Sequence, residues 1–237
     1  MINSLLLISL APVVIIAFYI NYRDRYEKEP ISVLLKALFT GVLIVLPVVI
    51  IELVLTLFSR NMEGLTEAAY TAFIVAGLTE EGIKYLALYL VFWKNRNFNE
   101  KYDGIVYAVF IALGFAAVEN ILYVISGGYG VGILRALTAV PAHALFGIMM
   151  GYYFGIARFN AEHKSVNLVF AFVLPFISHG LYDFLLLANV QLLLTAFIPV
   201  FIYFWINGFK KISKLSDASV FKADISDDSD CPERNNS

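Results

Sequence analysis

"GLTEEGIKYLAL", residues 77–88, places two adjacent glutamates and a lysine inside an apolar stretch that extends from about residue 68 to residue 93. An apolar stretch of about 20 residues is long enough to cross the roughly 30 Å hydrocarbon core of a membrane as a helix. A charge near the bilayer centre costs about 2.5–3.5 kcal/mol, so charged residues there face a partner or a polar cavity rather than lipid. The stretch therefore predicts a membrane-spanning helix that contributes to a buried polar site.

The composition extends this interpretation to the whole chain. It has 237 residues, of which 60% are hydrophobic and 15% charged, and its mean hydropathy is +0.77. Soluble domains are nearer half apolar and a quarter charged, so this composition predicts several membrane spans. The single cysteine, Cys231, excludes a disulfide within the chain and a cysteine metal cluster. The lipid bilayer is the expected surrounding, and nucleic acid is not expected as a partner.

Candidate membrane spans are the apolar stretches at approximately residues 2–20, 32–58, 68–93, 104–126, 133–157, 166–188 and 190–209. Backbone groups in lipid must be paired within their own segment, so each stretch is expected to be a helix. The first stretch lacks a basic region and a small-residue cleavage motif, which favours a retained span over a signal peptide. We therefore predict an all-α, polytopic membrane helix bundle with about seven transmembrane helices. A tight hairpin around Asn189 is expected to join the last two.

Lysine and arginine residues predict the orientation of this bundle. With seven spans, the basic segments 21–31, 94–103, 158–165 and the start of the segment after the last span all fall on one side. The other side carries little positive charge apart from Arg60 and Arg135, and it contains the glycine-rich turn "SGGYGVG" at 126–132. Positive charge marks the cytoplasmic side, so the N-terminus is predicted outside and the C-terminus inside.

The composition also divides the chain into two parts. Residues 1–212 are predicted to form the integral membrane domain. Residues 213–237 are polar, acidic and poor in aromatic residues, which is typical of a disordered segment. This second part is expected to be a solubilising cytoplasmic tail.

The charged group in the opening stretch has a defined geometry on a helix. Lys84 lies four residues after Glu80 and three after Glu81, so it shares a face with both carboxylates. One lysine neutralises only one carboxylate, and two neighbouring carboxylates in a low dielectric do not both ionise easily. One glutamate is therefore expected to keep its proton, which suits a general acid or base. An ion pair that fixes helix packing remains the alternative.

Three further polar groups lie in later spans. They are Glu119 and Asn120 in "GFAAVEN", where Phe115 precedes Glu119 by one turn, His143 in "VPAHALFGIMMG", and His179 with Asp183 in "SHGLYD". The last two residues are four apart, so the carboxylate can orient the histidine. The alternatives are a polar pair between helices for the first group, worth about a kcal/mol each, and a packing residue for His143.

These groups share a depth in the membrane. With a rise of 1.5 Å per residue, they lie about 8 to 18 Å from the outer ends of the third to sixth spans. The other spans carry almost no intramembrane charge apart from Lys36 and Glu52. Independent packing residues have no reason to share a depth, whereas a common site requires it. We therefore predict one polar, water-containing cavity that opens outward.

Such a cavity suits two kinds of activity. Intramembrane carboxylates and histidines can relay protons or ions for transport. They can also activate water for hydrolysis, with or without a metal. Transporters often contain internal repeats and broken helices, and the sequence shows no convincing repeat, which favours hydrolysis.

The same residues resemble the PrsW family of intramembrane proteases, which is distantly related to the type II CAAX prenyl proteases. The family pattern EExxK, FxxxEN, H and HxxxD is matched in order by Glu80, Glu81, Lys84, Phe115, Glu119, Asn120, His143, His179 and Asp183. The stretches "RDRYEKEP", "YDGIVYA" and "GIARF" are also similar. Each motif alone is weak, but the ordered set is specific, and the resemblance covers about residues 10–210.

The resemblance implies a membrane-embedded peptidase in a bacterial cell membrane. Such a protease makes the first cut, on the extracytoplasmic side, in a single-span membrane anti-sigma factor. A second intramembrane protease follows, and an extracytoplasmic-function sigma factor is activated under envelope stress. Two alternatives remain: a CAAX-like or bacteriocin-processing membrane peptidase, and a proton- or ion-coupled transporter that uses the same carboxylates.

Roles for the glutamates follow from the resemblance. Glu80 or Glu81 is expected to activate the water that attacks the scissile carbonyl. The other glutamate is expected to stay protonated and donate to the leaving amine. Lys84 is expected to decide which of the two is ionised.

The remaining residues have expected supporting roles. Asn120, His143 and His179 are candidates to stabilise the oxyanion. Asp183 is expected to orient His179, and Glu119 is a second acid or base, or a ligand. His143, His179 and Glu119 are candidate ligands for a zinc ion in a His₂Glu arrangement. However, no HExxH motif is present, and glutamate-dependent relatives slightly favour a site without metal.

Overall fold

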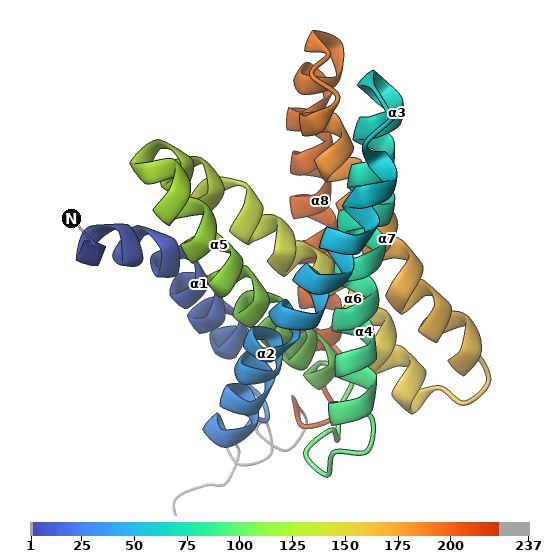
Figure 1. The fold of residues 1–237 in the computed structure, drawn as a ribbon. Coiled ribbons are helices and arrows are strands. Elements are labelled where there is room, and N and C mark those ends of the chain that lie inside the picture. The colour runs from blue at the N-terminus through green and yellow to red at the C-terminus, as the bar shows by residue number, and fades with distance from the viewer. Residues whose placement is uncertain (1, 223–237) are drawn as a thin grey trace, which may run out of the picture.

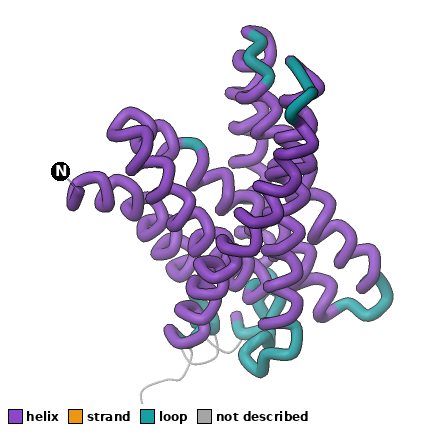
Figure 2. Tube along the Cα trace, viewed as in Figure 1, coloured by secondary structure: helices purple, strands orange, loops and turns teal. Residues whose placement is uncertain are grey.

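The computed structural model describes residues 2–222, and all the regular structure in that range is helical (Figure 2). The long helices are α1 (Ile2–Arg23), α2 (Ile31–Thr56), α4 (Thr79–Phe92), α5 (Asp103–Leu137), α6 (Ala139–Phe159), α7 (Lys164–Leu187) and α8 (Gln191–Asp217). Three short elements, η1 (Leu57–Ser59), α3 (Gly64–Ala69) and η2 (Tyr70–Leu78), connect α2 to α4. The predicted all-α class is therefore confirmed, and the predicted hairpin around Asn189 joins α7 to α8.

Five helical stretches are long and apolar enough to cross a membrane, and the longest, Asp103–Phe159, contains both α5 and α6. The chain is thus a polytopic membrane protein. The count of seven spans and the orientation stay predictions. α8 continues to Asp217, beyond the predicted start of the tail at residue 213, and residues 223–237 of that tail lie outside the described residues.

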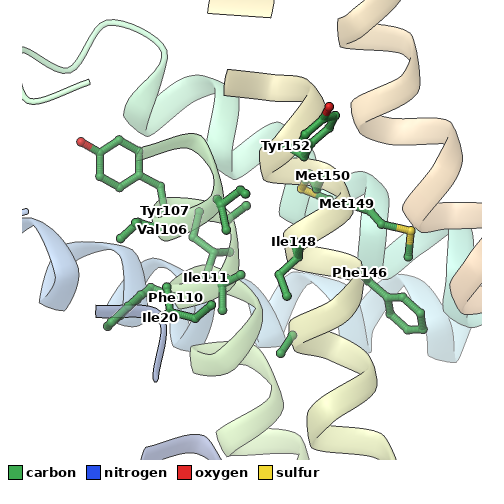
Figure 3. Packing of buried hydrophobic residues seen from close by; sticks show 14 of the residues in the cluster. Ile20, Val106, Tyr107, Phe110, Ile111, Phe146, Ile148, Met149, Met150 and Tyr152 are labelled. Atoms are coloured by element: carbon green, nitrogen blue, oxygen red, sulfur yellow. The ribbon is translucent and has the colours of Figure 1, made fainter. Parts of the chain in front are cut away.

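The N-terminal half of α5 packs along α6 at the core of the bundle, and most of the other long helices contact one or both of them. α5 is buried from Asp103 to Ala116 and α6 over most of its length, while α1, α2 and α8 expose many large apolar side chains. Figure 3 shows Ile111 of α5 and Ile148 of α6 within this core. A side chain at Gly151 of α6 would meet the backbone of Gly104 in α5. Small residues allow such close approach, which strengthens helix contacts in lipid.

The helix that carries the paired glutamates is preceded by an unusual segment. η2 is a π-helix over Tyr70–Leu78, and α4 continues from it without a break. The Thr79 hydroxyl donates to the Ile74 carbonyl, five residues earlier, at 3.3 Å. π-Helical segments are rare and occur frequently at functional sites. This one ends at Leu78, one residue short of Glu80 and Glu81, which occupy the first turn of α4.

A break within α5 brings its C-terminal part back toward the bundle. Gly128 has φ 74° and ψ −165°, a backbone conformation that glycine adopts most easily. The chain reverses there and runs as a helix to Leu137 (Figure 1). The predicted start of the next span at residue 133 is therefore wrong, because α6 begins at Ala139. The apolar residues before Ala139 belong to the returning end of α5.

Candidate active site

Lys84 lies at the centre of a buried cluster between α4 and α6. Its Nζ atom donates to Glu80 Oε2 at 2.9 Å and to Glu81 Oε1 at 2.8 Å, and it lies 3.2 Å from His143 Nδ1. The ammonium group also lies 4.2 Å from the ring centroid of Phe115. Because its two carboxylate contacts are nearly equal in length, the lysine does not select one glutamate by proximity.

His179 of α7 also belongs to this cluster. Its Nδ1 atom lies 2.9 Å from Glu81 Oε1, and its Nε2 atom lies 3.4 Å from Asp183 Oδ2. The imidazole stacks on Phe146 of α6, with ring centroids 5.0 Å apart and planes 19° apart. The ring is therefore held at both nitrogens and on one face, in keeping with the orienting role expected for Asp183.

His143 of α6 is held in the same manner. Its Nε2 atom lies 2.7 Å from Glu119 Oε2, while its Nδ1 atom faces Lys84 and lies 3.9 Å from Glu80 Oε2. Glu119 in turn pairs with Arg135, whose Nη2 atom lies 3.1 Å from the same carboxylate oxygen. The returning end of α5 therefore supplies a positive charge that fixes the carboxylate behind His143.

Asn120 has a different position from the one expected of an oxyanion donor. Its Nδ2 atom donates to the Ser9 carbonyl of α1 at 2.8 Å, and its Oδ1 atom accepts from Arg135 Nε at 3.0 Å. The residue is fully buried and does not line the cavity described below. With both ends of its amide engaged, Asn120 tethers α5 to α1 and to Arg135 rather than facing a substrate.

A cavity of about 640 Å³ opens beside the cluster. The polar and charged residues that line it include Glu52, Glu80, Glu119, Arg135, His143, His179, Tyr182 and Asp183. Glu81 and Lys84 do not line it and lie behind Glu80. The cavity is therefore lined by predicted residues from each of α4, α5, α6 and α7, and the two glutamates differ in their access to it. Their catalytic roles stay predictions.

The donor atoms of this cluster fit a divalent metal. One ligand atom from each of Glu80, Glu81, His143 and His179 lies within 4.8 Å of the others, and all four residues are buried. Both histidines direct Nδ1 into the cluster and Nε2 toward a carboxylate. Metal-binding histidines commonly show this pattern, since the outer carboxylate fixes the ring and raises its basicity.

The structure favours Glu81 over Glu119 as the carboxylate ligand of a metal at this cluster. The Oε2 atom of Glu81 is buried without a hydrogen-bond partner and so remains available to a cation. The predicted ligands His143 and His179 belong to this cluster. Glu119 instead lies behind His143, where it orients the imidazole. In the structure Lys84 supplies the positive charge among these donors.

Sequence reasoning missed several residues of the site. Arg135 was noted only as a charge near the glycine-rich turn, yet it contacts both Glu119 and Asn120. Tyr182 carried no signal beyond its place within "SHGLYD". Glu52 was assigned to the end of a span, but it lines the cavity. A search for basic residues flanking a glycine break would have singled out Arg135.

Comparisons of the sequence with known proteins give a consistent result. Residues 29–207 match the family described as "PrsW family intramembrane metalloprotease". The chain is 42% identical over 187 residues to Protease PrsW of Geobacillus kaustophilus, which covers 78% of this chain and 81% of that protein. It is 37% identical to Protease PrsW of Clostridioides difficile, over 91% of this chain and 93% of that one. For Protease PrsW of Bacillus subtilis the identity is 35%, with coverage of 90% and 96%. No solved structure matches the chain.

Proposed function

The chain belongs to the PrsW family of intramembrane metalloproteases, and we propose that it makes the first cut in a membrane-anchored anti-sigma factor. It is a membrane peptidase and a multi-pass protein of the plasma membrane. The observation that carries the proposal is the cavity in which Glu80 and two carboxylate-backed histidines meet.

A metal ion, with zinc as the proposed species, would be held by His143, His179 and Glu81. When bound, it would polarise the scissile carbonyl and make a nearby water more acidic. This proposal departs from the slight preference for a metal-free site, because the family is described as metalloproteases and both histidines have outer carboxylate partners. Asp183 and Glu119 keep the two rings in place.

Glu80 is the proposed general base because it faces the cavity, whereas Glu81 lies behind it. Glu80 takes a proton from the water as the oxygen bonds to the carbonyl carbon of the scissile peptide. The same proton passes to the leaving nitrogen as the carbon–nitrogen bond breaks, so the carboxylate is regenerated. Lys84 holds Glu80 in position through its contact with Oε2.

The position of the cavity supports a cut on the extracytoplasmic side. Its lining includes Thr56 at the end of α2, Thr138 between α5 and α6, and Leu187 at the end of α7. These positions lie at the end of the bundle opposite the basic connections 21–31 and 94–103. A single-span substrate entering from the lipid would therefore present its outer segment to Glu80.

The test is co-expression with a single-span anti-sigma factor tagged at both ends, followed by detection of fragments. Wild-type chain should produce a membrane fragment and a released outer fragment. Glu80→Gln should reduce the rate by about 10²–10⁴-fold, as expected for loss of a general base. Glu162→Gln is the matched control, because its side chain is 85% exposed in a connecting loop.

Equal fragments from wild type and Glu80→Gln would contradict the protease proposal. A cut that depends on Glu80 but falls in other membrane peptides, and not in any anti-sigma factor, would replace the substrate while retaining the chemistry. Proton flux in liposomes that depends on Glu80, without any cleavage, would instead favour the transporter.

A further inference from the structure

A second buried cluster of carboxylates lies at the opposite end of the bundle from the cavity. One oxygen from each of Asp24, Glu100 and Asp103 lies within 4.8 Å of the others. Asp103 also belongs to a second such group, with Glu27 and Glu29. These residues come from the α1–α2 connection, the α4–α5 connection and the start of α5. The exposed fractions of Asp24, Glu100 and Asp103 are 2%, 5% and 0%.

Several oxygens of this cluster have no hydrogen-bond partner although they are buried. The Oδ1 atoms of Asp24 and Asp103 are both unpaired. Their Oδ2 atoms are engaged: that of Asp24 accepts from the Glu29 backbone, and that of Asp103 from the backbones of Asn99 and Glu100. Backbone contacts thus fix each carboxylate through one oxygen and leave the other oxygen without a partner. Buried polar atoms in folded proteins usually have a hydrogen-bond partner, so each unpaired oxygen calls for an explanation.

Tyr102 adds a further unpaired polar group beside these carboxylates. Its side chain is 1% exposed, and its hydroxyl has no hydrogen-bond partner. Tyr102 lies between Glu100 and Asp103 in the sequence, and the charges of Asp24, Arg23 and Glu100 all act on its hydroxyl. A buried phenol without a partner is unfavourable, because removing a polar group from water without compensation costs about 1–3 kcal/mol.

No direct ion pair balances the negative charge of the cluster among the described residues. In the described part of the chain, no lysine, arginine or histidine nitrogen lies within 4.0 Å of these three carboxylates. Arg23 directly precedes Asp24, and its Nη2 atom donates to Ser213.

We propose that Asp24, Glu100 and Asp103 bind one hard divalent cation, such as Mg²⁺, Ca²⁺ or Mn²⁺. All the available donors are oxygens, which these ions prefer, and the site contains no histidine or cysteine that would favour zinc. The site is distinct from the cluster around Lys84 and does not depend on its chemistry. A cation there joins the α1–α2 connection to the start of α5. Ser219, just after α8, contacts Glu100, so the C-terminal helix is joined as well.

The test uses Mn²⁺ as the probe, because its electron paramagnetic resonance signal distinguishes free from bound ion. The full chain, purified in detergent with His143→Ala and His179→Ala, is titrated with Mn²⁺ at pH 8. These two substitutions remove the histidines of the cavity. One Mn²⁺ should bind per chain and be displaced by Ca²⁺ or Mg²⁺. Asp103→Asn in the same background should weaken binding about tenfold or more, as for loss of a metal-site residue.

Glu162→Gln is again the control, because it removes an exposed carboxylate at the same end of the bundle. Glu100→Gln provides a second variant if Asp103→Asn does not fold, and it should weaken Mn²⁺ binding similarly. Absence of saturable Mn²⁺ binding would overturn the proposal. Binding that Glu100→Gln leaves unchanged would also overturn it. Because the cavity histidines are absent, neither outcome bears on the proposed protease.

Discussion

The Nε2 atom of His143 lies 2.7 Å from Oε2 of Glu119, so an intramembrane carboxylate fixes the ring while Nδ1 faces Lys84 in the buried cluster. His179 repeats this relationship with Asp183 at 3.4 Å, although the two pairs come from different helices. The same arrangement, in which a carboxylate holds the Nε2 atom of a histidine, therefore occurs twice in the site. This arrangement gives Glu119 and Asp183 a role that does not require contact with a substrate.

Removing the carboxylate behind His143 should weaken metal binding without removing a ligand. In Glu119→Gln the amide retains the size of the side chain but loses its negative charge, so the imidazole is less firmly oriented and less basic. We expect zinc affinity to fall about 10–100-fold. Competition with a calibrated chelator measures this value. Unchanged affinity would mean that Glu119 serves only helix packing.

Arg135 should act as a positioning residue, because it holds Glu119 and Asn120 and the chemistry does not require it. Arg135→Ala should lower kcat more than it raises KM for a peptide substrate. Arg135→Lys should recover part of the loss, because it keeps the charge but not the two-sided contact. Arg60→Ala, at the predicted outer side, is the comparison. An effect of Arg135→Ala on KM alone would point to substrate binding instead.

Removal of metal should abolish cleavage if the histidine cluster holds a catalytic ion. We expect chelator-treated protein to lose activity and to regain it with one equivalent of zinc. His179→Ala should bind substoichiometric zinc and should not be rescued by the same addition. Full activity in metal-depleted protein would restore the alternative in which the glutamates act alone.

Close contact between α5 and α6 should make Gly151 intolerant of any side chain. A methyl group there would meet the Gly104 backbone, so Gly151→Ala should destabilise the protein by about 1–3 kcal/mol. Gly130→Ala is matched in chemistry, since a methyl group at that position meets nothing within 4 Å. In detergent, the midpoint of thermal unfolding should be lower for Gly151→Ala and unchanged for Gly130→Ala. Equal midpoints would show that the helices can separate without cost.

The helices and the membership of the site were largely predictable from local pattern. Apolar length predicts α2 within a few residues, and similar depth in the membrane relates Glu80 to His143. Depth along a helix follows from sequence position, whereas the direction of a side chain also depends on how helices rotate against each other. For that reason the pattern could not place Glu80 in the cavity and Glu81 behind it.

Contacts that depend on a reversal of the chain, or that join residues far apart in the sequence, could not be predicted. The return of α5 at Gly128 brings Arg135 onto Glu119, and an apolar run there has the same composition as the start of a span. Asp24 and Asp103 likewise meet only because two connections fold together at one end of the bundle. Neither residue lies in a periodic pattern, since each is placed by loop backbone contacts.

The π-helical segment Tyr70–Leu78 has a consequence for how this protein tolerates sequence change. Each residue of an α-helix turns the chain by about 100°, so the direction of Glu80 depends on how many residues precede it and how they are wound. Substituting one apolar residue of this segment for another should therefore be better tolerated than changing the number of residues in it. Deleting one of them would swing both glutamates by about a quarter turn from the histidines without removing any catalytic group.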